Sequence, residues 1–362
     1  MRTAAPPLDG PHIRMPSTAT KPILASESME IDGAVRAGNL AILTVGRSLR
    51  ESVYSLDQVR TGLENPNSAI RELNSLYWDR AGRRAYNPAG IDVFVADWDT
   101  LLILDGCRYD ALARAIDAFD IEGDLEARVS RGSATAEWLR GDFHGKTLDD
   151  TVYVTGSTML YQETVFREYV DVALHDVVDV WSGDIQYGED GVAPKAVAEE
   201  TRAAAERYPN KRLVAHFVQP HAPYIGRRGR EVFPDYRPNP LSERFRGEIE
   251  TDASTLRALY HENLDVVLQE VEALVDDLSG KTVITADHGM LLGERERPIP
   301  IKSFGHPPRM YVEEMVRVPW FVASYETRRR IVAGDTADGY ERKRDDDLDE
   351  QARDHLAQLG YR

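Results

Sequence analysis

Cysteine is almost absent from this chain of 362 residues. Cys107 is the only one, so no disulfide can form within the chain, which is typical of a reducing compartment. No apolar run approaches the roughly 20 residues that a membrane-spanning helix needs. The amino terminus carries Pro and charged residues where a signal peptide requires an apolar core. These absences predict a cytoplasmic protein without stable insertion in a membrane.

Lysine is also scarce. Only seven of the 44 basic residues are Lys, and 61 acidic residues give a formal charge of −17. An acidic surface that is poor in Lys stays hydrated in concentrated salt, and it disfavours non-specific binding of nucleic acid. The composition therefore predicts a halophile, with a haloarchaeal source. The alternative is an ordinary acidic protein.

The chain is long enough to bury a full core as one large domain with terminal additions. Residues 1–30 are rich in Pro, Ser, Thr and Ala, which predicts a disordered tail. Residues 31–90 form a predicted helical addition, with helices over 34–59 and 67–78 that serve packing or bind a partner. The catalytic domain is predicted over 91–330, and a charged helical segment over 331–362.

Short apolar runs alternate with helical patterns through the middle of the chain. Strands are predicted at 101–104, 151–155, within 170–181, and at 212–218, 281–286 and 316–322; helices at 109–119, 136–143, 191–208 and 253–278. The unbroken apolar run at 101–104 suits a strand covered on both faces. The predicted fold class is therefore α/β, a doubly wound, mostly parallel central sheet with helices on both faces.

Two predicted strands end on a carboxylate and then turn with Gly. The first runs into Asp105 and Gly106, and the other into Asp287, His288 and Gly289. Ligands of such sheets gather at the carboxyl ends of the strands, and an Asp-His pair offers an oxygen and a nitrogen that suit Zn²⁺ or Mn²⁺. The alternative for Asp105 is an N-cap of the helix that follows.

Small hydroxyl residues precede the predicted helix at 136–143, and they include Ser133 and Thr135. One of them is a candidate nucleophile, because free N–H groups and the helix dipole at a helix N-terminus favour an alkoxide and an incoming anion. Simple N-capping is the alternative.

Two loop histidines are further candidates. His221 lies just past the strand at 212–218, where prolines stiffen the loop, and His306 lies in a Gly-His-Pro segment. His216 lies inside the strand and is interpreted as structural. Arg108 is a candidate for binding a substrate anion, with a structural salt bridge as the alternative. Residues 226–250 are rich in Arg and Pro, and this composition predicts an irregular loop that crosses the strand ends.

In this order the motifs resemble the alkaline phosphatase superfamily, which includes sulfatases, lipoteichoic acid synthases and phosphoethanolamine transferases. The resemblance covers residues 97–323, and its most specific piece is TADHGMLLGE at 285–294. LLILDG at 101–106 resembles the first strand, whose acidic residue binds metal, and GSATAEW at 132–138 resembles the nucleophile segment. HAPY at 221–224 resembles the histidine segment near the substrate, and GHP at 305–307 resembles the later active-site histidine.

Two departures from the family pattern narrow this expectation. Cys107 lies on the wrong segment for the aldehyde chemistry of the main sulfatases. The loop around His221 also lacks the Asp of two-metal members, since no Asp follows His221 before Asp235. The resemblance therefore implies one divalent metal (Zn, Mn, Ca or Mg) with at most a weak second site. The implied ligands are Asp105, Thr135, Asp287, His288 and His306.

The implied activity is hydrolysis of a phosphate or sulfate ester through a metal-bound Thr135 or Ser133. His221 and His306 would contact the transferred group, and the substrate would be a small molecule or be linked to a glycan or lipid. The alternatives are a transferase that acts on a glycan or lipid, and a non-catalytic relative that binds an anionic glycan. The sequence does not predict an oligomeric state.

Overall fold

The computed structural model describes residues 66–80, 83–161, 170–182 and 192–334, all within one compact unit that begins at Gln58. The tail predicted over 1–30 and the helix predicted over 34–59 lie outside the described residues. Of the charged segment predicted over 331–362, only 331–334 are described, and these are not helical.

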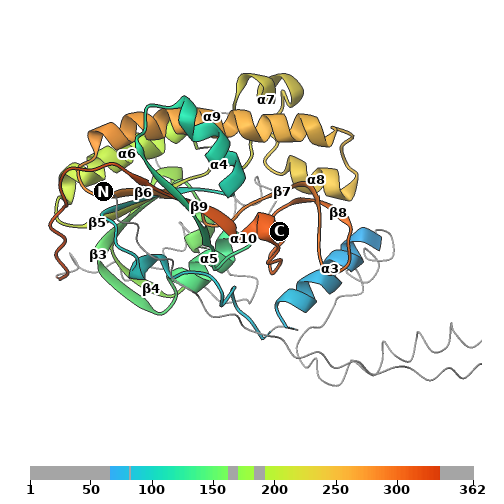
Figure 1. Cartoon of the computed structure of the whole chain (residues 1–362), viewed down its shortest axis with the longest axis horizontal. Helices are drawn as coiled ribbons and strands as arrows, with labels where there is room; N and C mark the ends of the chain where they lie inside the picture. The colour runs from blue at the N-terminus through green and yellow to red at the C-terminus, as the bar shows by residue number, and fades with distance from the viewer. Residues whose placement is uncertain (1–65, 81–82, 162–169, 183–191, 335–362) are drawn as a thin grey trace, which may run out of the picture. The chain divides into compact units, whose positions relative to one another are not determined.

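A seven-stranded sheet forms the centre of this unit (Figure 1). In spatial order its strands are β2 (Gly123–Val129), β9 (Arg317–Ala323), β6 (Thr282–Thr285), β1 (Thr100–Leu104), β5 (Arg212–Phe217), β3 (Lys146–Thr155) and β4 (Val172–Asp179). Neighbouring strands from β6 to β4 are parallel, whereas β9 runs antiparallel to β6 and β2. The predicted mostly parallel α/β fold is confirmed.

Strand β1 occupies the middle of the sheet, and all five of its residues are buried. Its neighbours are β6 and β5, and Ile103 is in register with Thr285 on one side and His216 on the other. Because these three strands are parallel, their carboxyl ends meet at one edge of the sheet. The residues that follow them are thereby brought together.

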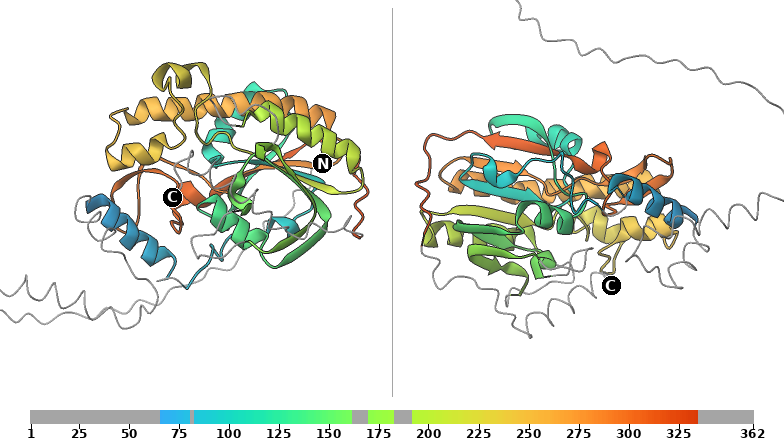
Figure 2. Two further views of the ribbon diagram at one scale, coloured as in Figure 1. Left: turned by 180° about the vertical axis from the view of Figure 1, so that it is seen from behind. Right: turned by 90° about the horizontal axis from the view of Figure 1, so that it is seen from below.

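Helices cover both faces of the sheet (Figures 1 and 2). The helices α4 (Tyr109–Ala115), α6 (Pro194–Arg207) and α9 (Ala253–Asp277) lie together over one face, and α5 (Thr135–Asp142) lies on the other. The long helix α9 begins where the Asp252 side chain accepts a hydrogen bond from the backbone N–H of Thr255. Within the described ranges, no helix is long and apolar enough to span a membrane.

Some elements differ from the sequence prediction. Strand β2 forms in a stretch predicted as turn-rich, and residues 226–250 contain the helices α7 (Arg227–Val232) and α8 (Pro240–Arg246). The side chains of β2 are nearly all exposed, so its pairing with β9 depends on backbone hydrogen bonds that leave no apolar pattern. A hairpin of β7 (Leu291–Arg295) and β8 (Lys302–Gly305) was also not predicted.

Helix α3 (Pro66–Trp78) packs beside this hairpin. The Arg71 guanidinium pairs with Glu296 at 2.7 Å and donates a hydrogen bond to the Phe304 carbonyl oxygen, and the Asn74 amide also donates to Glu296. The Glu296 carboxylate is fully buried. These contacts support the packing interpretation of the helix predicted at 67–78, and they brace the strand that leads to His306.

A second buried carboxylate, that of Glu137, connects α5 to the segment after β8. Glu137 is 1% exposed and accepts hydrogen bonds from the Ser133 hydroxyl at 2.7 Å, the Ser133 N–H at 3.0 Å and the Tyr311 hydroxyl at 3.2 Å. The Ser133 hydroxyl in turn accepts from the Met310 N–H. The start of α5 and the segment that follows His306 are therefore held together by one polar cluster.

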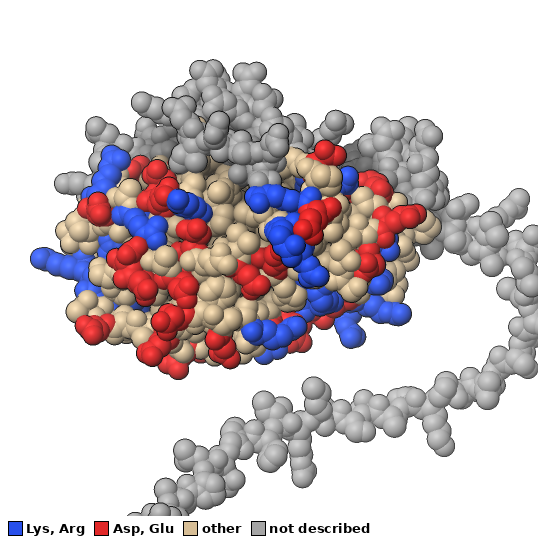
Figure 3. Space-filling model, turned by 90° about the horizontal axis from the view of Figure 1, so that it is seen from above, with Lys and Arg blue, Asp and Glu red and all other residues tan. Residues whose placement is uncertain are grey.

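Acidic and basic side chains are interspersed on the face seen in Figure 3. Ion pairs between side chains at the surface of the described unit include Arg202 with Asp277 and Arg227 with Glu231. Exposed pairs of this kind contribute little to stability. On this face the negative charge is thus spread among pairs rather than gathered in one patch.

We expect Glu137→Ala to destabilise the protein by about 3 kcal/mol, because two buried hydroxyls and a buried N–H lose their acceptor. The matched control is Glu199→Ala, which removes an exposed carboxylate paired with Lys195 at 3.7 Å and should change stability by less than about 0.5 kcal/mol. Urea unfolding followed by circular dichroism measures both. Equal losses in the two variants would contradict the role given to Glu137.

Candidate active site

The carboxyl ends of β1 and β6 bring Asp105, Asp287 and His288 together, and the first residue of α5 adds Thr135. The Thr135 hydroxyl donates a hydrogen bond to Asp287 Oδ2 at 2.7 Å, and it lies 3.5 Å from Asp105 Oδ2. All four residues are buried. The structure therefore gathers into one cluster residues that are far apart in the sequence.

Gly106 makes the approach of the two strand ends possible. Its φ of +70° lies in the region that favours glycine, and a Cβ there would be 2.8 Å from the Met290 side chain. In this conformation the Gly106 N–H donates to Asp287 Oδ1 at 3.0 Å. The sharp turn expected after Asp105 thus also orients the second carboxylate.

The orientation of His288 leaves one ring nitrogen free to accept. Its Nδ1 is 2.7 Å from the Gly289 carbonyl oxygen, so Nδ1 carries the proton and donates it. Its Nε2 is directed at the cluster, 3.3 Å from Asp287 Oδ2, 3.5 Å from Asp105 Oδ1 and 3.4 Å from Thr135 Oγ1, and in the neutral ring this atom carries the lone pair. A ring held by a hydrogen bond on its other nitrogen is the usual arrangement of a metal-binding histidine.

The electrostatics of the two carboxylates are unfavourable without a cation. Burial and the neighbouring Asp287 raise the pKa of Asp105 well above its usual range. Burial would also raise the pKa of Asp287, but His288, His216 and the hydrogen bonds from Thr135 and Gly106 together lower it. Two acidic groups so close in a buried site therefore cannot both stay ionised without a nearby positive charge.

His216, which the sequence led us to interpret as structural, also faces this cluster. Its Nδ1 is 2.6 Å from the Tyr153 hydroxyl, and its Nε2 lies 3.9 Å from Asp287 Oδ2. Burial lowers the pKa of His216 to about 4, so the ring is neutral at pH 7. The only feature of the sequence that could have indicated a role for His216 is that it is a polar residue within an apolar predicted strand. The structure adds that this strand pairs with β1.

Two atoms at this point lack a hydrogen-bond partner within the described part of the chain, namely Asp105 Oδ1 and His216 Nε2. Ligand atoms of Asp105, His216 and Asp287 lie within 4.8 Å of one another. Buried polar atoms without a partner are rare, and these two belong to residue types that bind metals. The donor set therefore fits a divalent metal ion.

His221 and His306 face each other beside the cluster. Their Nε2 atoms are 2.8 Å apart, and the His306 ring stacks on His288 with 4.6 Å between centroids. His221 Nδ1 donates to the Ala222 carbonyl oxygen, so His306 Nε2 carries the proton shared by the pair and His306 Nδ1 is left without a partner among the described residues. Burial lowers the pKa of His221 to about 4.

The structure places Ser133 and Arg108 away from the metal-binding atoms. The Ser133 hydroxyl is engaged by Glu137 and Met310, as described above. The Arg108 guanidinium pairs with Asp110 and Glu294, each at 2.8 Å, and donates to the Met290 carbonyl oxygen. Arg108 therefore forms a structural salt bridge, which was the alternative to binding a substrate anion.

No protein-family model and no curated protein sequence matches this chain. It is similar to the solved C-terminal periplasmic domain of EptC from Escherichia coli in complex with Zn, with 15% identity over 63% of this chain and 72% of that chain and a TM-score of 0.42.

Two further solved structures are similar to the chain. The lipooligosaccharide phosphoethanolamine transferase EptA from Neisseria meningitidis, an integral membrane protein, shares 12% identity over 81% of this chain and 59% of that chain, with a TM-score of 0.43. An alkaline phosphatase superfamily protein from Vibrio parahaemolyticus shares 13% identity over 68% of this chain and 64% of that chain, with a TM-score of 0.37.

Proposed function

We propose that this chain is a metal-dependent enzyme that moves a phosphate or sulfate group from an ester to Thr135 and then to water or an acceptor alcohol. The observation that carries this proposal is the position of the Thr135 hydroxyl, 2.7 Å from Asp287 within a buried cluster of carboxylates and an imidazole lone pair. A hydroxyl becomes a useful nucleophile when an adjacent base and a positive charge favour its alkoxide.

Asp105, Asp287, His288 and Thr135 would hold one divalent ion, with His216 as a further donor within reach. A mixed set of oxygen and imidazole donors favours Zn²⁺ or Mn²⁺ over Mg²⁺ or Ca²⁺, which prefer oxygen alone. A bound ion would lower the pKa of the Thr135 hydroxyl and offset negative charge on the transferred group.

In the first half-reaction the Asp287 carboxylate accepts the proton of Thr135 directly. Thr135 Oγ1 then attacks phosphorus or sulfur from the side opposite the leaving oxygen, so that a bond to Thr135 forms as the ester bond breaks. The departing alkoxide takes up a proton from water. In the second half-reaction water or an alcohol attacks phosphorus or sulfur and gives its proton to solvent. The bond to Thr135 Oγ1 then breaks, and this oxygen takes back the proton held by Asp287.

His221 and His306 are placed to contact the oxygens of the transferred group. Both rings are neutral because burial lowers their pKa values, and His306 Nε2 has a proton to donate as a hydrogen bond. The weak second metal site predicted from the sequence would use this pair, with His306 Nδ1 or the facing Nε2 atoms as ligands.

Turnover of nitrophenyl phosphate, sulfate and diester substrates tests the proposal, with Mn²⁺, Zn²⁺, Mg²⁺ or Ca²⁺ added in molar KCl. Free phosphate or sulfate identifies a hydrolase, and a product ester formed with added glycerol identifies a transferase. Binding of an anionic glycan without turnover of any ester would instead support the non-catalytic alternative.

The variants Asp287→Asn and His288→Ala should each weaken metal binding by at least about 100-fold and reduce turnover by a similar factor, because each removes a donor atom. Metal content after dialysis gives the first value independently of activity. Asp276→Asn and His261→Ala are the matched controls, because both residues lie on α9 and neither is a proposed metal ligand. Full metal binding by Asp287→Asn would refute the assigned metal site.

The Thr135→Ala variant should lose covalent labelling and reduce turnover by at least about 1,000-fold, because the nucleophile is gone. Thr135→Ser, which keeps a hydroxyl, should restore a labelled peptide, and Ser133→Ala should still be labelled at residue 135. Acid quenching followed by mass spectrometry of peptides locates the modification. Labelling at Ser133 in the Thr135→Ala variant would exchange the roles of the two residues.

A further inference from the structure

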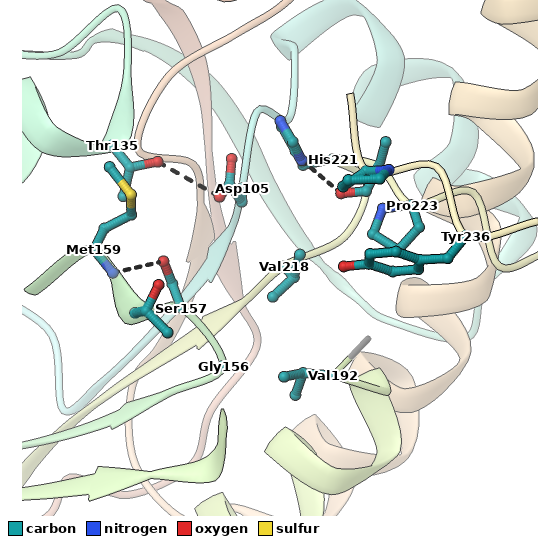
Figure 4. Close-up of a pocket in the computed structure, with 13 residues that line it drawn as sticks. Asp105, Thr135, Gly156, Ser157, Met159, Val192, Val218, His221, Pro223 and Tyr236 are labelled. Carbon is teal, nitrogen blue, oxygen red and sulfur yellow. Dashed lines mark hydrogen bonds between the residues drawn. The ribbon is translucent and has the colours of Figure 1, made fainter. Parts of the chain in front are cut away.

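A pocket adjoins the proposed nucleophile at the carboxyl ends of β3 and β5 (Figure 4). Thr135 and Asp105 form one end of it. The opposite side is formed by His221, Pro223 and Tyr236. A group displaced in line by Thr135 leaves on the side away from that hydroxyl. The far part of this pocket is therefore where the alcohol portion of an ester would lie.

The walls of the far part are neutral. Among the described lining residues, Asp105 is the only one with a carboxyl group, and it belongs to the proposed metal site. Thr135 and the imidazole of His221 also line the pocket beside that site. The remaining lining residues are apolar or carry a hydroxyl: Gly156, Ser157, Thr158, Met159, Val192, Val218, Ala222, Pro223, Tyr236 and Pro238. Moving a charged group from water to such walls is unfavourable unless a partner charge meets it.

The two charged neighbours of Tyr236 in the sequence are not among the described lining residues, and the acidic one, Asp235, is exposed to solvent. Arg237 follows Tyr236, but its guanidinium pairs with Glu243 and lies over the Phe233 ring. Burial raises the pKa of the Tyr236 phenol to about 12, so this hydroxyl keeps its proton and is uncharged at pH 7. In Figure 4 the ring lies beneath Pro223 and its hydroxyl points toward Val218.

The walls are also held in place before any ligand binds. The Ser157 N–H donates to the Thr155 hydroxyl at 2.9 Å, which donates back to the Ser157 carbonyl oxygen, and the Met159 N–H donates to the Ser157 hydroxyl. A Cβ on Gly156 would lie only 3.2 to 3.3 Å from Val192 and Val218. The apolar floor is thus tightly packed and cannot easily rearrange around a hydrated ion.

The net charge of −17 is a competing effect, since it attracts cations in general. At physiological salt, however, exposed charges farther than about 8 Å are largely screened, and molar salt shortens this distance further. The groups that touch the ligand therefore decide its chemistry. In the far part of the pocket, the described lining residues carry no acidic or basic side chain.

We propose that the alcohol portion of the substrate is uncharged and has an apolar face, and that esters with a cationic alcohol such as ethanolamine are poor substrates. This inference rests on the proposed function, because it assigns the pocket by its position relative to Thr135. Such a preference would distinguish this chain from enzymes whose substrates carry an ammonium head group.

The test compares the 2-phenylethyl and 2-aminoethyl esters of whichever acid the enzyme turns over. The ammonium group lowers the pKa of its alcohol and makes that ester intrinsically more reactive, so a preference for the phenylethyl ester reports the pocket. We expect kcat/KM to be at least about tenfold higher for the phenylethyl ester. An equal or reversed preference would overturn the inference while the proposed function stands.

Binding gives an independent measurement if no ester is turned over. We expect 2-phenylethylphosphonate to bind the metal-loaded protein at least about tenfold more tightly than 2-aminoethylphosphonate in titration calorimetry. Absence of turnover with this order of affinities would reject the proposed catalysis and keep the pocket assignment. The opposite order would reject the pocket assignment.

A charge placed on the wall should reverse the preference. Val218→Asp should shift the ratio of kcat/KM values toward the aminoethyl ester by about tenfold, whereas the similarly shaped but neutral Val218→Asn should not favour it. Met159→Glu and Met159→Gln form a second pair on the neighbouring wall, in case the first pair does not fold. If the folded acidic variants show no shift in the ratio of kcat/KM values, the alcohol portion does not lie against these walls.

Discussion

The repulsion between two buried carboxylates, Asp105 and Asp287, is the constraint on which the candidate site depends. Each lies at the end of a central parallel strand, and burial together with their proximity makes ionisation of both costly. A divalent cation held as we propose would remove that cost, with Asp105, His288 and His216 among the residues that could donate to it. The same proximity brings the Thr135 hydroxyl to hydrogen-bonding distance.

Two further buried carboxylates, outside the cluster, hold its parts in place. Glu137 joins the start of α5, which carries Thr135, to the segment after His306. Glu296 fixes the β7–β8 hairpin against α3 through Arg71 and Asn74. Positions of groups that transfer protons or bind a metal tolerate little error, so such supporting contacts matter as much as the ligands themselves. Helix α3 thereby contributes to the site without touching it.

The proposed reaction divides the site into two chemically different halves. The half around Thr135 is rich in oxygen and nitrogen donors and suits a charged phosphate or sulfate group with its metal ion. The half beyond it is apolar and neutral. Because an ester joins an anionic group to an alcohol, this division follows the chemistry of the substrate. On this proposal, the wall residues decide the identity of the alcohol, and the metal ligands decide the identity of the transferred group.

The sequence by itself determined the fold class and most elements, because apolar runs such as 101–104 and the long pattern of α9 record burial directly. It also indicated Asp105, Asp287 and His288, since acidic residues just after parallel strands share one sheet edge. It did not reveal β2, whose side chains are nearly all exposed, or the β7–β8 hairpin, whose two strands are only five and four residues long. Only the tertiary structure brought His216 to the cluster, gave Ser133 to Glu137 and paired Arg108 with Glu294. Each of these contacts depends on which residues the folded chain brings together. Residue type alone does not show which residue will lie within contact distance.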